Sequence, residues 1–423
     1  MSTAKRHRRL GKDIQQVIKA DDPQISIHLV NGSTHDIKAL LIPVCAPYAG
    51  GMYSFSLKFP ENYPDSPPSC QITTTNRGVT RFNPNLYAGG KVCLSILGTF
   101  SGPSWSSVLN LSTILQSILS LFCETPFTNE PSFENLKHRN YAQLSDRYNE
   151  KITHENLRIS VIMRVEELLA LSDADLQMDP FATPILATFL QRKHLYLATC
   201  DAMKHLDGKA FQTMPFEFPA NQMSGTFSFS TLAKRITAVH EALVRRIRTP
   251  VTPPPPPPDV SHLAYVESFT ESPRGTYTAV VSGPPDTPWR GISIPVRVTW
   301  SGVAAVPCLA EICCEMVHPL VHAGVPFIPP AQTTHPVAVI EAVWEAFKGF
   351  AGTHHPLAVL CEQAEREMRA SGTAFCKRAR EMAGGGGEEE SDENVGGAGE
   401  DDENVRPRKK RQGPSLGDVI VID

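Results

Sequence analysis

Residues 81–96 read RFNPNLYAGGKVCLSI and place a polar segment, Asn83-Pro84-Asn85, and a glycine pair ahead of a single cysteine, Cys93. The glycines allow the backbone to turn sharply, so an amide before the turn can approach a thiol after it. A cysteine carries an acyl group when its thiolate is accessible and a donor stabilises the oxyanion formed by attack on a carbonyl. The Asn85 side chain is such a donor. The stretch therefore predicts acyl transfer on Cys93.

Other interpretations of these residues stay open. Cys93 in an apolar segment can be an inert core thiol, and Asn85 after a proline can simply cap a turn. A cysteine hydrolase would need a histidine beside the thiol to activate both the nucleophile and a water. No such triad is evident around Cys93, and His138 and His154 are the candidates for that histidine.

Several spaced motifs together resemble the catalytic domain of the ubiquitin-conjugating enzyme family. In chain order they are residues 47–51 (PYAGG), 59–64 (FPENYP), Pro67-Pro68, Asn83-Pro84-Asn85, 93–97 (CLSIL) and Trp105. The Z-type subgroup of that family is similar at residues 98–105 (GTFSGPSW), 127–134 (FTNEPSFE), 148–150 (YNE), His154-Glu155 and 225–227 (GTF). The resemblance covers residues 1 to about 248.

The resemblance implies an α+β ubiquitin-conjugating (UBC) fold, with an antiparallel sheet flanked by helices. It further implies that Cys93 receives ubiquitin or a ubiquitin-like protein as a thioester from an activating enzyme that uses ATP, with no cofactor bound directly. The modifier then passes to a substrate lysine or to a ligase. Asn85 would stabilise the oxyanion, Asn83 and Pro84 would support the loop, and Glu130, or its neighbour Asn129, would lie near the thiol.

The loops that face ubiquitin ligases in the family correspond here to Asp65 and Ser66, and to Trp105, Ser106 and Ser107. Asp65 stands where an aromatic or apolar residue is common, and Ser107 where a proline is common. Asn83 likewise replaces the usual histidine. A ligase that buries an apolar anchor would leave the Asp65 charge poorly paired, so we expect a restricted set of ligases.

Composition narrows the class of protein. A chain of 423 residues with 41% hydrophobic content can bury a large core and form two or three domains. The net charge of -4 predicts no nucleic-acid partner, and no apolar run approaches the roughly 18 residues of a membrane span. The ten cysteines are scattered, which predicts neither a disulfide framework nor a metal site and favours a reducing compartment.

Hydrophobic periodicity predicts the elements of the first part of the chain. We expect a helix over residues 8–20, strands over 26–30, 37–44, 52–59 and 69–73, and a helix over 109–123. Further helices are expected over residues 140–170, 183–207 and 229–247. We place the catalytic UBC domain at residues 1–150 and a helical extension at 151–248.

A proline-rich linker is expected at residues 249–260 and a second, catalytically inactive UBC-like domain at 261–383. The second domain is indicated by a partial repeat: strand 276–281, a Gly-Pro-Pro turn, and strand 292–300, with helices over 336–347 and 356–382. His318-Pro319-Leu320 replaces the asparagine motif, and Phe327 or Ile328 replaces the cysteine, so this copy should be inert. An unrelated small domain with a similar turn is the alternative.

Residues 384–423 are of low complexity and are expected to be disordered. The basic cluster at residues 406–411 has the composition of a nuclear-import signal, so we expect the protein in the nucleus and cytoplasm. The terminal residues Val419, Ile420, Val421 and Ile422 resemble a SUMO-interacting motif, although a terminal strand or an aggregation-prone segment would look the same. The rival to the whole assignment is a ubiquitin-binding scaffold without catalysis.

Overall fold

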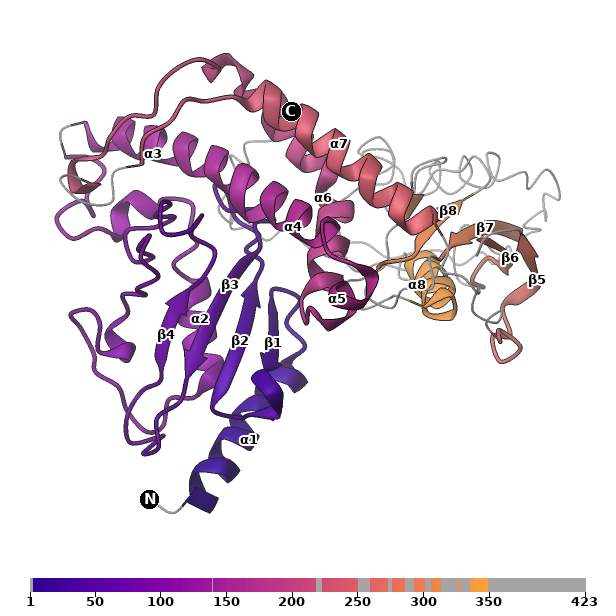
Figure 1. Ribbon diagram of the computed structural model, residues 1–423, viewed down its shortest axis with the longest axis horizontal. Coiled ribbons are helices and arrows are strands. Elements are labelled where there is room, and N and C mark those ends of the chain that lie inside the picture. Colours follow the sequence, from indigo (N-terminus) through magenta and orange to yellow (C-terminus); the bar gives the residue numbers. More distant parts are fainter. Residues whose placement is uncertain are drawn as a thin grey trace, which may run out of the picture. The chain divides into compact units, whose positions relative to one another are not determined.

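The computed structural model describes residues 3–138, 140–217, 223–249, 259–272, 276–285, 293–300, 306–312, 326–327 and 335–348. These residues form two antiparallel sheets, one of four strands and one of five, with helices beside them (Figure 1). We call residues 3–249 the N-terminal region and residues 259–348 the C-terminal region. None of the described helices is both long and apolar enough to cross a membrane.

The first sheet is a simple meander preceded by a helix. Helix α1 (Thr3–Ala20) leads into β1 (Ile25–Leu29), β2 (Asp36–Leu41), β3 (Tyr53–Lys58) and β4 (Ser69–Ile72), which pair in that order. The predicted strands are confirmed, but the strand expected over 37–44 ends at Leu41, because Pro43 has no N–H to donate to the ladder.

The hydrophobic core lies between this sheet and helices α1 and α2 (Leu111–Leu119) (Figure 1). Side chains alternate along a strand, so Ala39 and Leu41 of β2 face the core beside Phe55 of β3. Asn110 starts α2 by accepting a hydrogen bond of 2.9 Å from the Thr113 amide, which satisfies one of the free donors of the first turn. The predicted α+β fold with a sheet flanked by helices is confirmed.

The helical extension begins inside the catalytic part of the chain. Helix α3 (Tyr141–Glu155) continues through η4 (Asn156–Met163), a π-helical segment, into α4 (Arg164–Leu169), as the predicted helix 140–170 requires. The predicted domain boundary at residue 150 therefore falls within a continuous helix, and it is not a break in the fold. Helices α6 (Ala182–Met203) and α7 (Phe229–Arg248) pack on each other, and α5 (Asp173–Met178) was not predicted. Short helical turns complete the N-terminal region: η1 (Val30–Gly32), η2 (Ser95–Leu97), η3 (Pro126–Asn129), η5 (Lys204–Leu206) and η6 (Pro215–Glu217).

Buried polar contacts join this extension to the first sheet. The Tyr53 hydroxyl donates to Asn156 Oδ1 of η4 over 2.7 Å, and the Tyr196 hydroxyl of α6 donates to the Gly50 carbonyl over 2.8 Å. Gly50 has a φ of +69° and a Cβ there would lie 2.6 Å from the Tyr196 oxygen, so this close approach requires glycine. The extension is thus packed against the sheet and is not an appendage.

The second sheet pairs β5 (Val266–Ser272), β6 (Thr276–Ser282), β7 (Ser293–Thr299), β8 (Leu309–Ile312) and β9 (Pro326–Phe327) in chain order. Helix α8 (Pro336–Lys348) contacts β7, and their shared core is apolar. The predicted strands 276–281 and 292–300 and the helix 336–347 are confirmed.

The relationship of this sheet to a second UBC fold stays a prediction. It has five strands where the first has four, and residues 259–265, the described residues just before β5, form turns instead of a helix. Phe327 lies in β9 opposite Ala310. The remaining predictions lie outside the described residues: the linker prolines, His318-Pro319-Leu320, Ile328, the helix 356–382, the basic cluster and Val419-Ile420-Val421-Ile422.

Candidate active site

The loop that carries Cys93 is anchored to the edge of the first sheet. The Ile72 amide of β4 donates to the Gly90 carbonyl over 2.9 Å, and isolated bridges join Gln71 to Lys91 and Leu86 to Val92. Gly90 has a φ of +94°, which an L side chain rarely adopts, so the turn before Cys93 depends on glycine.

Cys93 and Asn85 lie next to each other, as the sequence predicts. The Cys93 amide donates to the Asn85 carbonyl over 2.8 Å, and Asn85 Nδ2 donates to the Cys93 carbonyl, also over 2.8 Å. An amide nitrogen carries two hydrogens, so Nδ2 keeps a second donor. Asn85 Oδ1 is buried and has no hydrogen-bond partner among the described residues.

The Asn83 side chain links the Asn85 loop to buried groups of the core. Its Oδ1 accepts the Asn85 amide over 2.9 Å, while Nδ2 donates to the Leu121 carbonyl over 2.8 Å and to the Tyr48 hydroxyl over 3.1 Å. The neighbouring Asn129 also approaches Asn83 Oδ1, at 3.4 Å. The side chain therefore fixes the position of Asn85 through groups that are themselves buried.

Sequence reasoning missed the importance of Arg81. This buried side chain stacks its guanidinium 4.1 Å from the centre of the Tyr87 ring and donates to the Pro84 carbonyl. It also forms an ion pair of 3.3 Å with Glu130. Glu130 thus lies at the loop, as predicted, because it pairs with Arg81. The two residues are 49 positions apart, so no local sequence pattern predicts this pair.

The groups around Cys93 have opposite effects on the pKa of its thiol. Burial raises the pKa of the Cys93 thiol, Lys91 and Arg81 lower it, Glu130 raises it, and a hydrogen bond with the Tyr87 side chain lowers it. Burial likewise raises the pKa of Glu130, against the opposing effect of Arg81. The sulfur therefore lies among groups that partly offset the cost of forming a thiolate.

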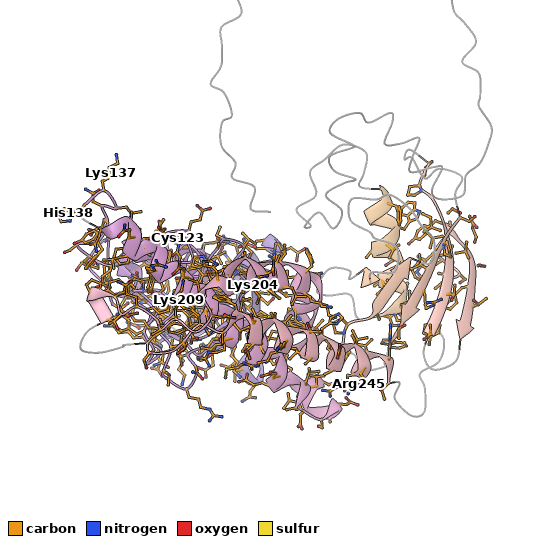
Figure 2. The ribbon with its side chains drawn as sticks, turned by 90° about the horizontal axis from the view of Figure 1, so that it is seen from above. Cys123, Lys137, His138, Lys204, Lys209 and Arg245 are labelled. Atoms are coloured by element: carbon orange, nitrogen blue, oxygen red, sulfur yellow. The ribbon has the colours of Figure 1, made fainter. Side chains whose placement is uncertain are left out.

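Among the described residues, neither candidate histidine of a cysteine hydrolase is held at Cys93. Both ring nitrogens of His154 are engaged elsewhere, with Glu155 at 3.1 Å and Ser228 at 3.2 Å, inside a cage of phenylalanines. His138 contacts Tyr141 and projects from one end of the N-terminal region beside Lys137 (Figure 2). Among the residues described, no group of three or more His, Cys, Asp or Glu side chains could hold a metal ion.

The predicted ligase-facing residues come from two loops that touch. Trp105 Nε1 donates to the Pro64 carbonyl over 2.7 Å, and its ring lies 5.9 Å from that of Tyr63. Asn62 donates to Ser66 Oγ over 2.6 Å. Asp65, Ser106 and Ser107 are exposed next to them, so the five residues share one surface.

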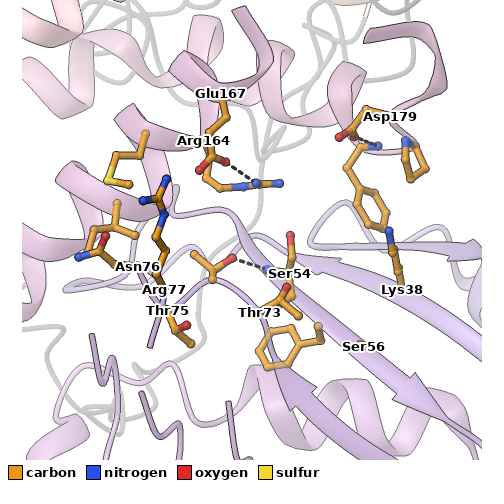
Figure 3. A pocket seen from close by; sticks show the side chains of 16 residues that line it. Lys38, Ser54, Ser56, Thr73, Thr75, Asn76, Arg77, Arg164, Glu167 and Asp179 are labelled. Atoms are coloured by element: carbon orange, nitrogen blue, oxygen red, sulfur yellow. Dashed lines mark hydrogen bonds and ion pairs between the residues drawn. The ribbon is translucent and has the colours of Figure 1, made fainter. Parts of the chain in front are cut away.

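A separate cavity of about 510 Å³ lies between strands β2 and β3, the segment 73–77 that follows β4, and the helical extension (Figure 3). Its lining mixes hydroxyl groups with charged side chains, among them Lys38, Arg77 and Arg164, the last paired with Glu167 at 2.7 Å. Neither Cys93 nor Asn85 lines it, so this cavity takes no part in chemistry on the thiol.

The comparisons with known proteins agree with this fold and site. A family model described as ubiquitin-conjugating enzyme matches residues 9–155, which include α1, the first sheet and the Cys93 loop. Together with a relative that is 35% identical and covered over 72% of its length, this match shows that the chain belongs to the ubiquitin-conjugating enzyme family.

Its relatives indicate the subgroup. The chain is 35% identical over 244 residues to ubiquitin-conjugating enzyme E2 Z of Xenopus tropicalis, covering 57% of this chain and 72% of the relative. It is 35% identical over 249 residues to the E2 Z protein of Danio rerio, covering 58% and 70%. Probable ubiquitin-conjugating enzyme protein 17 of Caenorhabditis elegans is 37% identical over 166 residues, covering 37% of this chain and 23% of the relative. The similarity is thus of the Z type and extends beyond the family model into the helical extension.

Proposed function

We propose that this protein carries ubiquitin or a ubiquitin-like protein as a thioester on Cys93 and transfers it to a lysine or to a ligase. In the first step the Cys93 thiolate attacks the thioester of an activating enzyme, and the activating enzyme's cysteine leaves as a thiolate. In the second step a substrate amine attacks the carbonyl, an amide forms, and the Cys93 thiolate leaves. The observation that carries the proposal is the pair of 2.8 Å hydrogen bonds that keep Asn85 beside Cys93.

Each residue has a defined role in this proposal. Asn85 uses its second Nδ2 hydrogen for the oxyanion, which is the former carbonyl oxygen of the thioester once its carbon is attacked. Glu130 accepts the proton of the attacking amine, since its carboxylate is held beside the loop by Arg81 at 3.3 Å. Asn83 and Pro84 keep the loop in place.

The interaction partners follow from the family. An activating enzyme that uses ATP loads Cys93, so the protein itself needs no bound cofactor. A ligase docks on the surface of Asp65, Ser66, Trp105, Ser106 and Ser107, where Trp105 is half-buried and Val108 is 79% exposed. SUMO binding by Val419-Ile420-Val421-Ile422 and a distribution over nucleus and cytoplasm remain predictions from the sequence.

A charging assay tests the proposal. The purified protein is incubated with activating enzyme, ATP and ubiquitin, or a panel of ubiquitin-like proteins, and analysed on gels with and without reductant. We expect a reductant-sensitive adduct that Cys93→Ala loses and that Cys123→Ala, a variant of a half-buried thiol, keeps. The absence of an adduct with every modifier would favour the scaffold without catalysis.

A further inference from the structure

Arg81 is a charged side chain at the Cys93 site, and the proposed chemistry uses it only to hold Glu130 beside the loop. It is only 3% exposed, and burying a guanidinium is costly unless several partners compensate for lost water. Its polar partners belong to the site: the Pro84 carbonyl and the Glu130 carboxylate at 3.3 Å. The guanidinium also lies 4.1 Å from the centre of the Tyr87 ring and 5.7 Å from that of Phe216. Groups at the Cys93 site thus offset part of the cost of burial, while Nε has no hydrogen-bond partner among the described residues.

One nitrogen makes both polar contacts. Arg81 Nη2 carries two hydrogens and donates to Pro84 of the asparagine loop and to Glu130 of the following loop. The planar guanidinium can do this while it stacks on Tyr87, which the flexible ammonium of a lysine would not reproduce. Arg81 thus connects the two loops that supply the oxyanion donor and the acidic group.

We propose that Arg81 is a positioning residue of the Cys93 site, which ties Glu130 to the Asn85 loop and places a positive charge beside the sulfur. The charge favours the thiolate that attacks and later leaves, while the ion pair with Arg81 opposes the effect of burial, which raises the pKa of Glu130. The part that concerns transfer rests on the proposed function, whereas the part that concerns the thiol does not.

The groups that face Cys93 make the test specific. These are Lys91, Arg81, Glu130 and Tyr87. Removing Arg81 leaves the Glu130 charge uncompensated, so the pKa of Cys93 should rise; removing Glu130 should lower it. Opposite signs from the two halves of one ion pair cannot come from a loss of packing alone.

The experiment measures the rate of Cys93 alkylation by iodoacetamide against pH, with the labelled peptide quantified by mass spectrometry. We expect the midpoint to rise by roughly one pH unit in Arg81→Met, to fall in Glu130→Gln, and to return towards wild type in the double variant. Arg81→Lys should keep the midpoint but lose the planar guanidinium that stacks on Tyr87 and fixes the position of Nη2, so transfer from a charged enzyme to free lysine should slow roughly tenfold. Arg158→Met is the matched control, because it removes another guanidinium paired with a buried carboxylate, at 2.6 Å from Glu155.

An unchanged midpoint in both Arg81→Met and Glu130→Gln would overturn the proposal, as would an equal rise in Arg158→Met. If Arg81→Met does not fold, Glu130→Gln alone decides, since its midpoint must fall. Alkylation needs neither ubiquitin nor activating enzyme, so the proposal can succeed or fail whether or not Cys93 is charged.

Discussion

The two sheets each hold a buried cysteine in a different electrostatic setting. Cys93, 5% exposed, lies beside the first sheet among Lys91, Arg81 and Tyr87, which offset part of the cost of ionisation. Cys308, 0% exposed, lies in the apolar core of the second sheet, where burial raises its pKa well above the ordinary range. Burial alone makes a thiol inert, and the polar loop after β4 is what makes Cys93 suitable for chemistry.

The largest expected difference between the two regions is thiol reactivity. In the folded protein near pH 8, we expect iodoacetamide to modify Cys93 roughly a thousandfold faster than Cys308, because the thiolate fraction falls tenfold for each unit of pKa and Cys308 needs local opening. Pulsed labelling with mass spectrometry gives both rates, and labelling in denaturant should make them equal. Comparable rates in the folded protein would remove the contrast.

The next largest expected change is in stability, and it concerns the buried ion pair between Lys151 of α3 and Glu217 of η6. Lys151 Nζ lies 2.6 Å from Glu217 with side chains 0% and 1% exposed. Lys151→Met leaves a buried carboxylate without its partner, so unfolding free energy should fall by about 3–5 kcal/mol in urea titrations. Lys204→Met, from an exposed pair with Asp201, should change it by less than about 0.5 kcal/mol. Equal effects would mean that burial does not distinguish the two pairs.

The oxyanion role of Asn85 predicts a smaller change, confined to the reaction. Asn85→Ala should slow transfer from charged Cys93 to lysine about a hundredfold, equivalent to about 2.7 kcal/mol, in a single-turnover discharge assay. Asn110→Ala is the matched control: it removes the α2 cap and about 1 kcal/mol of stability but should leave discharge unchanged. A normal rate in Asn85→Ala would leave that side chain only its turn-capping role.

The smallest predicted effect is on acid stability. Burial would raise the pKa of Glu155, but hydrogen bonds from Arg158 and His154 outweigh it and hold the pKa below its ordinary value of 4.5. The stabilisation is therefore present above pH 4.5 and is lost as pH falls through the folded-state pKa. Glu155→Gln should remove about 1–2 kcal/mol of this pH dependence in urea titrations at several acidic pH values.

Glu267 offers the comparison in the second sheet. The hydroxyl groups of Ser282 and Ser293 donate to the two Glu267 carboxylate oxygens, each over 2.7 Å. These hydrogen bonds lower the pKa of this exposed carboxyl group. Glu267→Gln should change the acid dependence less than Glu155→Gln does, because solvent screens the exposed group. A larger effect of Glu267→Gln would show that the buried contacts of Glu155 with Arg158 and His154 do not control the acid stability of the protein.

The fold class, the order of the elements and the closeness of Asn85 to Cys93 could be predicted from the sequence. These features depend on local rules: alternation along strands, helical periodicity, and a glycine at a φ of +94° that returns the chain towards β4. Asn85 and Cys93 are only eight positions apart, so one turn suffices to bring them together. Motif order then made the family recognisable.

The distant groups that complete the site could not be predicted, because they come together only when separate elements pack in three dimensions. Arg81 and Glu130 are 49 positions apart, and Lys151 and Glu217 are 66 apart. Hydrophobic periodicity and turn residues do not predict such pairs, because the two residues meet only when separate helices and loops pack together. The expected boundary at residue 150 lies inside the helix that begins at Tyr141, and the hydrogen bond from Tyr53 to Asn156 shows that this helix is continued by residues packed against the first sheet.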